Sequence, residues 1–457
     1  MPASSAPAST RRHAAARGGR LGAVRVLVCL ALLLEGMASS SINVQVEPVR
    51  VDLGLGPVEL QLVASAFLVL YAGLLPIAGR LVDSRGARGA FRLGVALFVL
   101  GSLLCAGAWD GWALVAGRAV QGVGAALSAP AALALVTSGL GAGSLRDRAV
   151  ATYGAMGAAG FSLGLVVPGF VVAHAGWRAS FAVLAPVGIA LAVATWHIER
   201  GAAPTRERVG GARAVVLTAV LAAVLVALGG IGTLPASVVA GVGAAALAGA
   251  VALALAPGRR LVPPELLRLP SVRAASVSLA ALFAGVLASL FVVSLALQTG
   301  RDLDAFDVGL LLLPQPLAFA LVARVGARAV GRWGAPRALA AGIGAVLAAL
   351  AALSLAPGLP TAVVLPAMAG IGVGLALAYP AASIWAVDGA PPSARGTTAA
   401  LLTTAQNVGG ASGLAVLTAL SLVPPATSAG PGLMVSAALL VLGAALAFTL
   451  GRRTQPS

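Results

Sequence analysis

The sequence predicts an all-α polytopic membrane protein, and three observations support this fold class. Long apolar stretches recur along the whole chain, and about 20 apolar residues are enough for one α-helix to cross a bilayer core of about 30 Å. Charged residues make up only 10% of the chain and the mean hydropathy is +1.00, so a soluble domain of this length would lack a wettable surface. Finally, arginines gather in alternate loops.

Fourteen of the apolar stretches are expected to be transmembrane helices. They form two six-helix halves, in residues 22–198 and 258–450, with a central two-helix insertion in the segment 199–257. Residues 1–21 and 451–457 are expected to be cytoplasmic tails, the first of them disordered. The predicted spans are 22–44, 58–78, 90–108, 112–139, 147–172, 178–198, 213–233, 237–257, 274–297, 305–324, 336–356, 361–384, 397–421 and 431–450.

The arginine distribution predicts the orientation in the membrane. All 30 basic residues are Arg, and all except Arg50, Arg118, Arg178 and Arg301 fall in alternate loops and in the tails. Because positive loops stay on the cytoplasmic side, both termini are predicted to be cytoplasmic. The net charge of +16 then reflects topology and lipid headgroups, not nucleic-acid binding. The replacement of every lysine by arginine suggests a GC-rich bacterial genome, and we expect a monomer in the bacterial inner (cell) membrane.

Absent residue types exclude several functions. Without lysine, the chain has neither the P-loop cation of ATP hydrolysis nor a retinal Schiff base. His13, His174 and His197 do not cluster, and Cys29 and Cys105 lie in apolar spans, so neither a metal site nor a Ser-His catalytic set is expected. We therefore expect a transporter rather than an enzyme, with no cofactor and with a gradient as its energy source.

Small residues recur at matching places in the two halves. Gly160 and Gly164 in the fifth span have counterparts in Gly409, Gly410 and Gly413 of the thirteenth span, which is the fifth of the second half. Such spacing is typical of close helix packing. Two comparable halves that rock about a central site are how secondary transporters alternate access.

The segment between the second and third spans reads GRLVDSRGARG. It resembles the G-x-L-x-D-x-x-G signature of the major facilitator superfamily, with Gly79, Leu81, Asp83, Gly86 and Arg88 on the matching positions. The glycines allow a tight turn and close helix approach, and an aspartate can pair with arginines or with a helix N-terminus. The segment is therefore expected to be a cytoplasmic gating loop; the alternative is a solvated turn with a helix cap.

The fourth span carries Arg118, Gln121, Gly122 and Gly124, an arrangement similar to the R-x-x-Q-G-x-G element of drug:proton antiporters in that superfamily. The GWR sequence at 176–178 resembles the start of their sixth span. Together with the extra middle pair, these motifs resemble the fourteen-span branch over nearly the whole chain. The resemblance implies multidrug or antibiotic efflux by proton antiport.

Departures from the family pattern leave proton coupling open. Ala38 stands where the first span of this branch usually has an aspartate. The fifth-span antiporter motif appears as Gly164 followed by Pro168 and Gly169, with the proline shifted by one turn, and Gly331 replaces an acid in the second-half counterpart of the gating loop. Proton coupling therefore cannot simply be carried over from the family.

Glu35 is the one carboxylate, and Arg118 the one cation, that we place well inside a span. Measured from the predicted outer ends of their helices, they lie about 12 Å and about 9 Å deep. In the family fold both helices border the central cavity, so the resemblance implies that these side chains meet or share a water. Ionisable groups at such depth are costly and mark functional sites. Glu35 is therefore the proton-coupling candidate, with a permanent structural ion pair to Arg118 as the alternative.

The remaining polar groups of the spans are candidates for lining a substrate cavity or for bonding neighbouring helices. They are Asn43, Gln121, Tyr153, Gln298, Gln406 and Asn407. Aromatic residues make up only 4% of the chain, which favours a cavity of small apolar residues and a hydrophobic or amphipathic substrate. The expected function is export of drug-like or secondary-metabolite molecules in exchange for protons. Alternatives are a narrow-specificity metabolite carrier or uniporter, and a non-transporting membrane sensor or scaffold.

Overall fold

The computed structural model describes residues 8–138, 140, 143–194, 211–231, 234–255, 264–391, 394–420 and 429–452, and within these ranges it contains helices and no strands. The helices of the N-half are α1 (Ala8–Leu53), α2 (Pro57–Arg85), α3 (Ala87–Ala106), α4 (Gly111–Thr137), α5 (Ser144–Ala182) and α6 (Leu184–Ala194). The middle pair is α7 (Gly211–Gly230) and α8 (Ala236–Leu255). The C-half contains α9 (Pro264–Arg268), α10 (Pro270–Arg301), α11 (Ala305–Leu312), α12 (Pro314–Trp333), α13 (Ala335–Ser354), α14 (Thr361–Asp388), α15 (Arg395–Ala419) and α16 (Ala429–Arg452).

Helices occupy every predicted span, but the number of membrane crossings stays a prediction. Eleven stretches of the described residues are long and apolar enough to cross a membrane. The fifth and sixth predicted spans merge into one such stretch, Arg148–Val193, which Gly176 interrupts with a φ of 80°. The described apolar part of α7, Val216–Gly230, is shorter than the others. α15 is not among the eleven, because polar side chains such as Gln406 lower its hydropathy.

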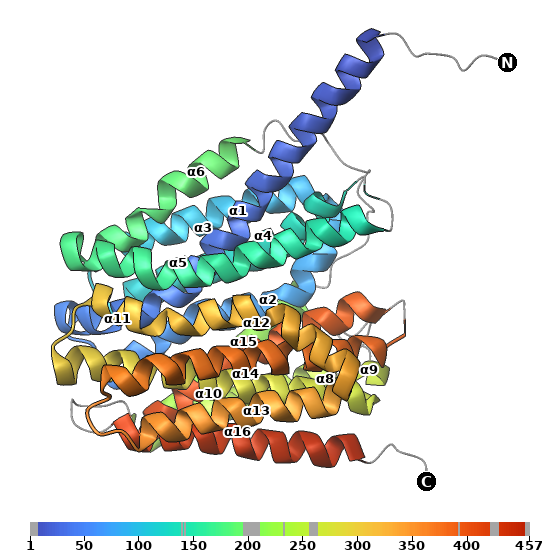
Figure 1. Cartoon of the computed structure of the whole chain (residues 1–457). Helices are drawn as coiled ribbons and strands as arrows, with labels where there is room; N and C mark the ends of the chain where they lie inside the picture. The colour runs from blue at the N-terminus through green and yellow to red at the C-terminus, as the bar shows by residue number, and fades with distance from the viewer. Residues whose placement is uncertain are drawn as a thin grey trace.

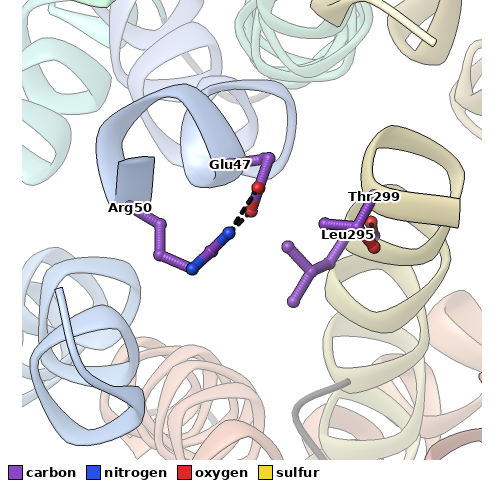
Figure 2. Close-up of polar contacts among 4 residues, drawn as sticks. All are labelled: Glu47, Arg50, Leu295 and Thr299. Carbon is purple, nitrogen blue, oxygen red and sulfur yellow. Dashed lines mark hydrogen bonds and ion pairs between the residues drawn. The ribbon is translucent and has the colours of Figure 1, made fainter. Parts of the chain in front are cut away.

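α1 is longer at both ends than the sequence predicts. It begins at Ala8, so the part of the expected disordered tail from residue 8 onward is helical, which fits its alanine and arginine content. It also continues to Leu53, because the polar residues that suggested an earlier end have partners. Arg50 donates two hydrogen bonds to Glu47, at 2.7 and 2.6 Å, and Figure 2 shows this ion pair opposite Leu295 and Thr299 of α10.

The two halves repeat the same contact between their first and fifth helices. In the N-half, a Cβ atom on Gly160 or Gly164 would overlap backbone atoms of α1. In the C-half, a Cβ atom on Gly409 or Gly413 would overlap carbonyl oxygens of α10. The matching glycines of the sequence are therefore packing positions in both halves, as predicted.

A second repeat concerns the fourth helix of each half. On α4, a Cβ on Gly122 would lie 2.5 Å from the Phe67 carbonyl oxygen of α2, and Gly124 packs on α3. On α14, Gly372 packs on α12 and Gly374 packs on α13 in the same way. The second and third helices also meet at equivalent turns, where Gly86 has a φ of 87°. Its counterpart, Gly334 between α12 and α13, has a φ of 80°.

The halves join along α2 and α15 and at the end of the bundle where α1 ends and α4 begins. We call it the outer end, since the predicted orientation places it outside the cell. One hydrophobic core combines the C-half with the outer parts of α1, α2, α4 and α5. There Gly309 of α11 lies against the Leu165 carbonyl of α5, and Ser294 of α10 donates to the Asn43 carbonyl of α1. Figure 1 shows the N-half in blue to green lying over the C-half in yellow to red.

The middle pair packs on one side of the boundary between the halves. α7 contacts both α2 and α15, and a Cβ on Gly73 of α2 would overlap Thr218 of α7. α8 packs on α7, and only 6% of its apolar stretch Ala236–Leu253 is buried. α7 is therefore part of the helix bundle, whereas α8 presents an apolar face suited to lipid.

Candidate functional site

Glu35 lies in α1, between α4 and α5, and is 6% exposed. The Ser128 hydroxyl of α4 lies 2.6 Å from one carboxyl oxygen, Oε1, while the other oxygen, Oε2, is buried without a hydrogen-bond partner. α5 approaches closely on the other side, because a Cβ on Gly36 would lie 2.6 Å from the Gly157 carbonyl oxygen. The carboxyl is thus enclosed by protein and held by one hydroxyl.

Arg118 lies in α4 and is fully buried. Its Nη1 donates to the Ala38 carbonyl of α1 at 2.9 Å and to Gln121 Oε1 at 3.1 Å, and its Nε donates to the Val63 carbonyl of α2 at 3.4 Å. The guanidinium carbon also lies 4.9 Å from the centre of the Phe67 ring. The cation therefore joins α1, α2 and α4 through neutral partners.

The expected direct contact between Glu35 and Arg118 is wrong, and so is the alternative of an ion pair, whereas a shared water stays a prediction. They are the only buried charged side chains of the described residues, yet neither belongs to an ion pair there. The depth estimate was wrong because it ended the first span at residue 44. Measured from Leu53, Glu35 lies about 27 Å along α1, whereas Arg118 lies about 10 Å along α4. Arg118 reaches the Ala38 carbonyl instead, one helical turn from Glu35.

The three tyrosines of the chain lie in α2, α5 and α14. Tyr71 of α2 and Tyr153 of α5 are within electrostatic range of the Glu35 carboxyl, and Tyr379 of α14 is within range of Tyr71. All three side chains are half-buried. Tyr379 packs edge-on against two phenylalanines of the C-half. Two half-buried tyrosines, Tyr71 and Tyr153, therefore lie near Glu35.

The predicted cavity residues separate into two groups. Asn43 and Asn407 are buried and donate to carbonyls of their own helices, and Gln298 donates to Ser294. Gln121 is fully buried between Arg118 and Ser102, so its side chain joins α3 and α4 and does not line a cavity.

The second group is half-buried. Tyr153 donates to the Ala129 carbonyl of α4 at 2.8 Å, and Gln406 has no hydrogen bond recorded for its side chain. These two residues keep the accessibility that substrate contact requires.

The predicted gating loop is mostly helix. α2 continues to Arg85, so Gly79, Leu81 and Asp83 lie in its last turns, and Gly86 alone makes the turn. Gly79 has no neighbour within 4 Å of a Cβ position, so the expected close helix approach at this glycine is absent. Arg88, in the first turn of α3, is half-buried and has an interaction partner. The Asp83 side chain lies outside the described residues, and its latch role stays a prediction.

The remaining predicted packing positions meet neighbours. Gly169 faces the Ala305 carbonyl of α11, Gly410 faces Leu287 of α10, and Pro168 is buried inside α5.

Sequence reasoning missed Ser128, Tyr71 and Tyr379. Ser128 lies in an apolar span where a lone serine carries no motif. The tyrosines had a usable signal, since the chain has only three and all fall within predicted spans.

The arrangement is suited to exchange of a proton. A carboxyl group in this enclosure is stable when neutral, because an isolated buried carboxylate with one hydrogen bond and no cation is costly. Its single donor-acceptor partner, a hydroxyl, serves either protonation state. The half-buried tyrosines provide π-faces and hydroxyl groups nearby.

Comparisons with known proteins agree with this architecture. The family model described as Major Facilitator Superfamily matches residues 28–414. The chain is 32% identical over 434 residues to a cephamycin export protein of Amycolatopsis lactamdurans, covering 90% of this chain and 87% of that protein. It is 31% identical over 398 residues to an uncharacterized MFS-type transporter, EfpA, of Mycobacterium tuberculosis, covering 85% and 74%.

Another relative is a puromycin resistance protein of Streptomyces alboniger, 32% identical over 419 residues, with 87% of this chain and 81% of the relative covered. Among solved structures, the inward-open xylose transporter XylE of E. coli has a TM-score of 0.66 at 14% identity, covering 96% of this chain and 97% of that one. That likeness concerns the fold. The chain is a multi-pass membrane transporter rather than an enzyme, and it belongs to the major facilitator superfamily.

Proposed function

We propose that the protein is a secondary active exporter that moves drug-like or secondary-metabolite molecules out of a bacterial cell in exchange for protons. Relatives whose names state cephamycin export and puromycin resistance support the direction and the substrate class. Alternating access by two rocking halves suits the repeated helix contacts of the N-half and the C-half.

The observation that carries the proposal is the surroundings of Glu35. It is the one buried carboxylate of the described residues, it has no cationic partner, and it lies beside half-buried tyrosines. A substrate that binds near these tyrosines would alter the polarity around the carboxyl and thereby its proton affinity. In this proposal Glu35 is the proton-coupling carboxylate, in place of the aspartate that is absent at position 38.

The proposed topology has fourteen crossings of the inner membrane, both termini in the cytoplasm and a monomeric protein. The first described turn of α1 and the last of α16 lie at the same end of the bundle, as an even number of crossings requires (Figure 1). Contact of the halves at the outer end corresponds to a state in which the substrate path is closed to the outside.

A vesicle assay tests the exporter directly. Inverted membrane vesicles are energised to acidify their interior, and a panel containing puromycin, a cephamycin, hydrophobic cations and neutral antibiotics is added. Wild type should dissipate the pH gradient with at least one compound, and Glu35→Gln should not. Glu47→Gln, which changes a partly exposed carboxylate of the same helix, is the matched control and should behave as wild type.

A second candidate is a narrow-specificity carrier or uniporter, which the missing acid at Ala38 favours. It predicts substrate flux that is independent of the pH gradient and equal in wild type and Glu35→Gln. Either result would reject proton-coupled export through Glu35.

A further inference from the structure

We propose that Ser128 is the positioning residue for Glu35, and that its hydroxyl reverses the direction of its hydrogen bond when Glu35 gains or loses a proton. The proposal deepens the proposed function, on which its biological meaning rests. It concerns a residue that belongs to none of the sequence motifs and that also packs against Gly94 of α3.

The geometry around Ser128 carries the proposal. Its Oγ lies 2.6 Å from Glu35 Oε1 and 2.8 Å from the carbonyl oxygen of Gly124, one turn earlier in α4. The side chain is 1% exposed, so water is not a competing partner. A serine hydroxyl has one proton and accepts with its lone pairs, so it donates to only one of these two oxygens at a time.

Each protonation state of Glu35 selects one arrangement. When Glu35 is neutral, its O–H donates to Ser128 Oγ and the serine donates to the Gly124 carbonyl, so both protons are used. When Glu35 is ionised, the hydroxyl hydrogen of Ser128 turns about the Cβ–Oγ bond and the hydroxyl donates to the carboxylate. The Gly124 carbonyl keeps its helical hydrogen bond, because α4 continues past this turn. The heavy atoms need not move in either case.

No other group of the described residues replaces Ser128. Tyr153 of α5 donates to the Ala129 carbonyl, so its proton is turned away from Glu35. Arg118 of α4 is bound to the Ala38 carbonyl. Tyr71 of α2, Tyr379 of α14 and the free Cys29 of α1 are further titratable groups nearby, and none of them donates a hydrogen bond to the carboxyl. Ser128 is thus the one hydrogen-bond partner of Glu35.

Removing the hydroxyl therefore acts mainly on the ionised form. In Ser128→Ala the neutral acid loses a hydrogen bond between neutral groups, whereas the carboxylate loses a stronger, charge-assisted one, which is its only side-chain donor. A hydrogen bond to a charged group corresponds to a change of about tenfold or more in the proton-binding equilibrium. Glu35 in Ser128→Ala should consequently release its proton at a pH about one unit or more above that of wild type.

Infrared pH-difference spectroscopy of the full-length protein in lipid vesicles measures this without a substrate. The C=O stretch of a protonated carboxyl that disappears in Glu35→Gln is assigned to Glu35 and titrated. We expect the midpoint in Ser128→Ala to shift upward by about one unit or more. Ser128→Thr, which retains the hydroxyl, should restore the wild-type midpoint.

Ser436→Ala is the matched control. Ser436 is a fully buried serine of α16 with the same hydrogen bond to the carbonyl four residues earlier, but no carboxylate beside it. It should leave the Glu35 midpoint unchanged. A folded Ser128→Ala protein with the wild-type midpoint, or a wild-type Glu35 band that does not titrate, would overturn the proposal.

The titration also separates this proposal from the exporter itself. A shifted midpoint in Ser128→Ala, together with no response of any compound in the vesicle assay, would reject proton-coupled export and keep the role of Ser128. Gradient dissipation that depends on Glu35, together with an unshifted midpoint, would keep the exporter and reject Ser128.

Discussion

Glu35 and Arg118 both lie between α1 and α4, yet their surroundings differ. Arg118 donates three hydrogen bonds, to oxygens of α1, α2 and α4, and lies over an aromatic ring, and only its Nη2 has no hydrogen-bond partner. Glu35 has a single hydroxyl partner, at Oε1, and its Oε2 has none. A guanidinium keeps its charge at all physiological pH values, so it must be satisfied permanently. A carboxyl group can become neutral, so it tolerates a site with fewer hydrogen-bond partners. The comparison separates a structural charge from one suited to proton exchange.

The largest effect on stability is expected for Arg118→Ala. It removes the guanidinium's hydrogen bonds to the Ala38 and Val63 carbonyls and to Gln121 Oε1 and opens a cavity, which should cost about 3–5 kcal/mol. The yield of folded protein and its melting temperature in detergent check this. Arg332→Ala, which removes an exposed arginine in the last turn of α12, should leave the melting temperature nearly unchanged. Equal melting temperatures for the two variants would contradict a structural role for Arg118.

A smaller effect is expected when α1 is pushed away from α5 beside Glu35. In Gly36→Ala, the new Cβ would lie 2.6 Å from the Gly157 carbonyl oxygen and 2.9 Å from the Phe161 nitrogen, and helix backbones cannot yield locally. We expect a loss of about 1–3 kcal/mol and reduced transport. Gly154→Ala, on α5 with open space around it, is the control. Wild-type stability and transport in Gly36→Ala would show that this close contact is not required.

The Phe67 ring beside Arg118 should contribute less to the stability of the fold than either Arg118 or the close contact at Gly36. Phe67→Leu removes the cation-π contact and part of a buried ring, and Phe98→Leu removes the same volume from a buried position of α3 without a cation above it. The two variants should differ by about 1 kcal/mol, with Phe67→Leu the less stable. Chemical or thermal unfolding in one detergent checks the difference, and an equal loss in both would remove the ring from the description of the Arg118 site.

The smallest effect on stability, with the largest on function, is expected for Glu35→Gln. The amide imitates the neutral acid and can donate to Ser128 Oγ, so the free energy of unfolding should change by less than about 1 kcal/mol. Substrate binding should persist while gradient-driven transport is lost. A strong loss of the melting temperature would instead indicate that the carboxylate has a structural role, as Arg118 does.

Much of the fold was predictable because it depends on helix-scale patterns. Apolar length, alternate arginine loops and the glycines at 160, 164, 409 and 413 are properties of single helices or of repeats, and the structure contains the corresponding helices and packing contacts. The end of α1 was not predictable, because Glu47 and Arg50 read as a polar loop until their ion pair is known.

The site was predictable only in part, for a related reason. Glu35 and Arg118 stood out as isolated charges in apolar spans, but their partners depend on how far each helix continues. A nine-residue extension of α1 beyond the predicted span, to Leu53, changes the depth of Glu35 and gives it Ser128 in place of Arg118. The pairing of side chains across two helices depends on their relative register, which a single sequence does not contain.

The most direct test of the central claim, that Glu35 exchanges the coupled proton, is to count protons released when substrate binds. A pH-indicator dye in weakly buffered detergent solution reports the release from purified wild type, Glu35→Gln and Glu47→Gln. The account predicts up to about one proton per bound molecule from wild type and from Glu47→Gln, and none from Glu35→Gln. Equal release from Glu35→Gln and wild type would contradict it and place the coupling group elsewhere.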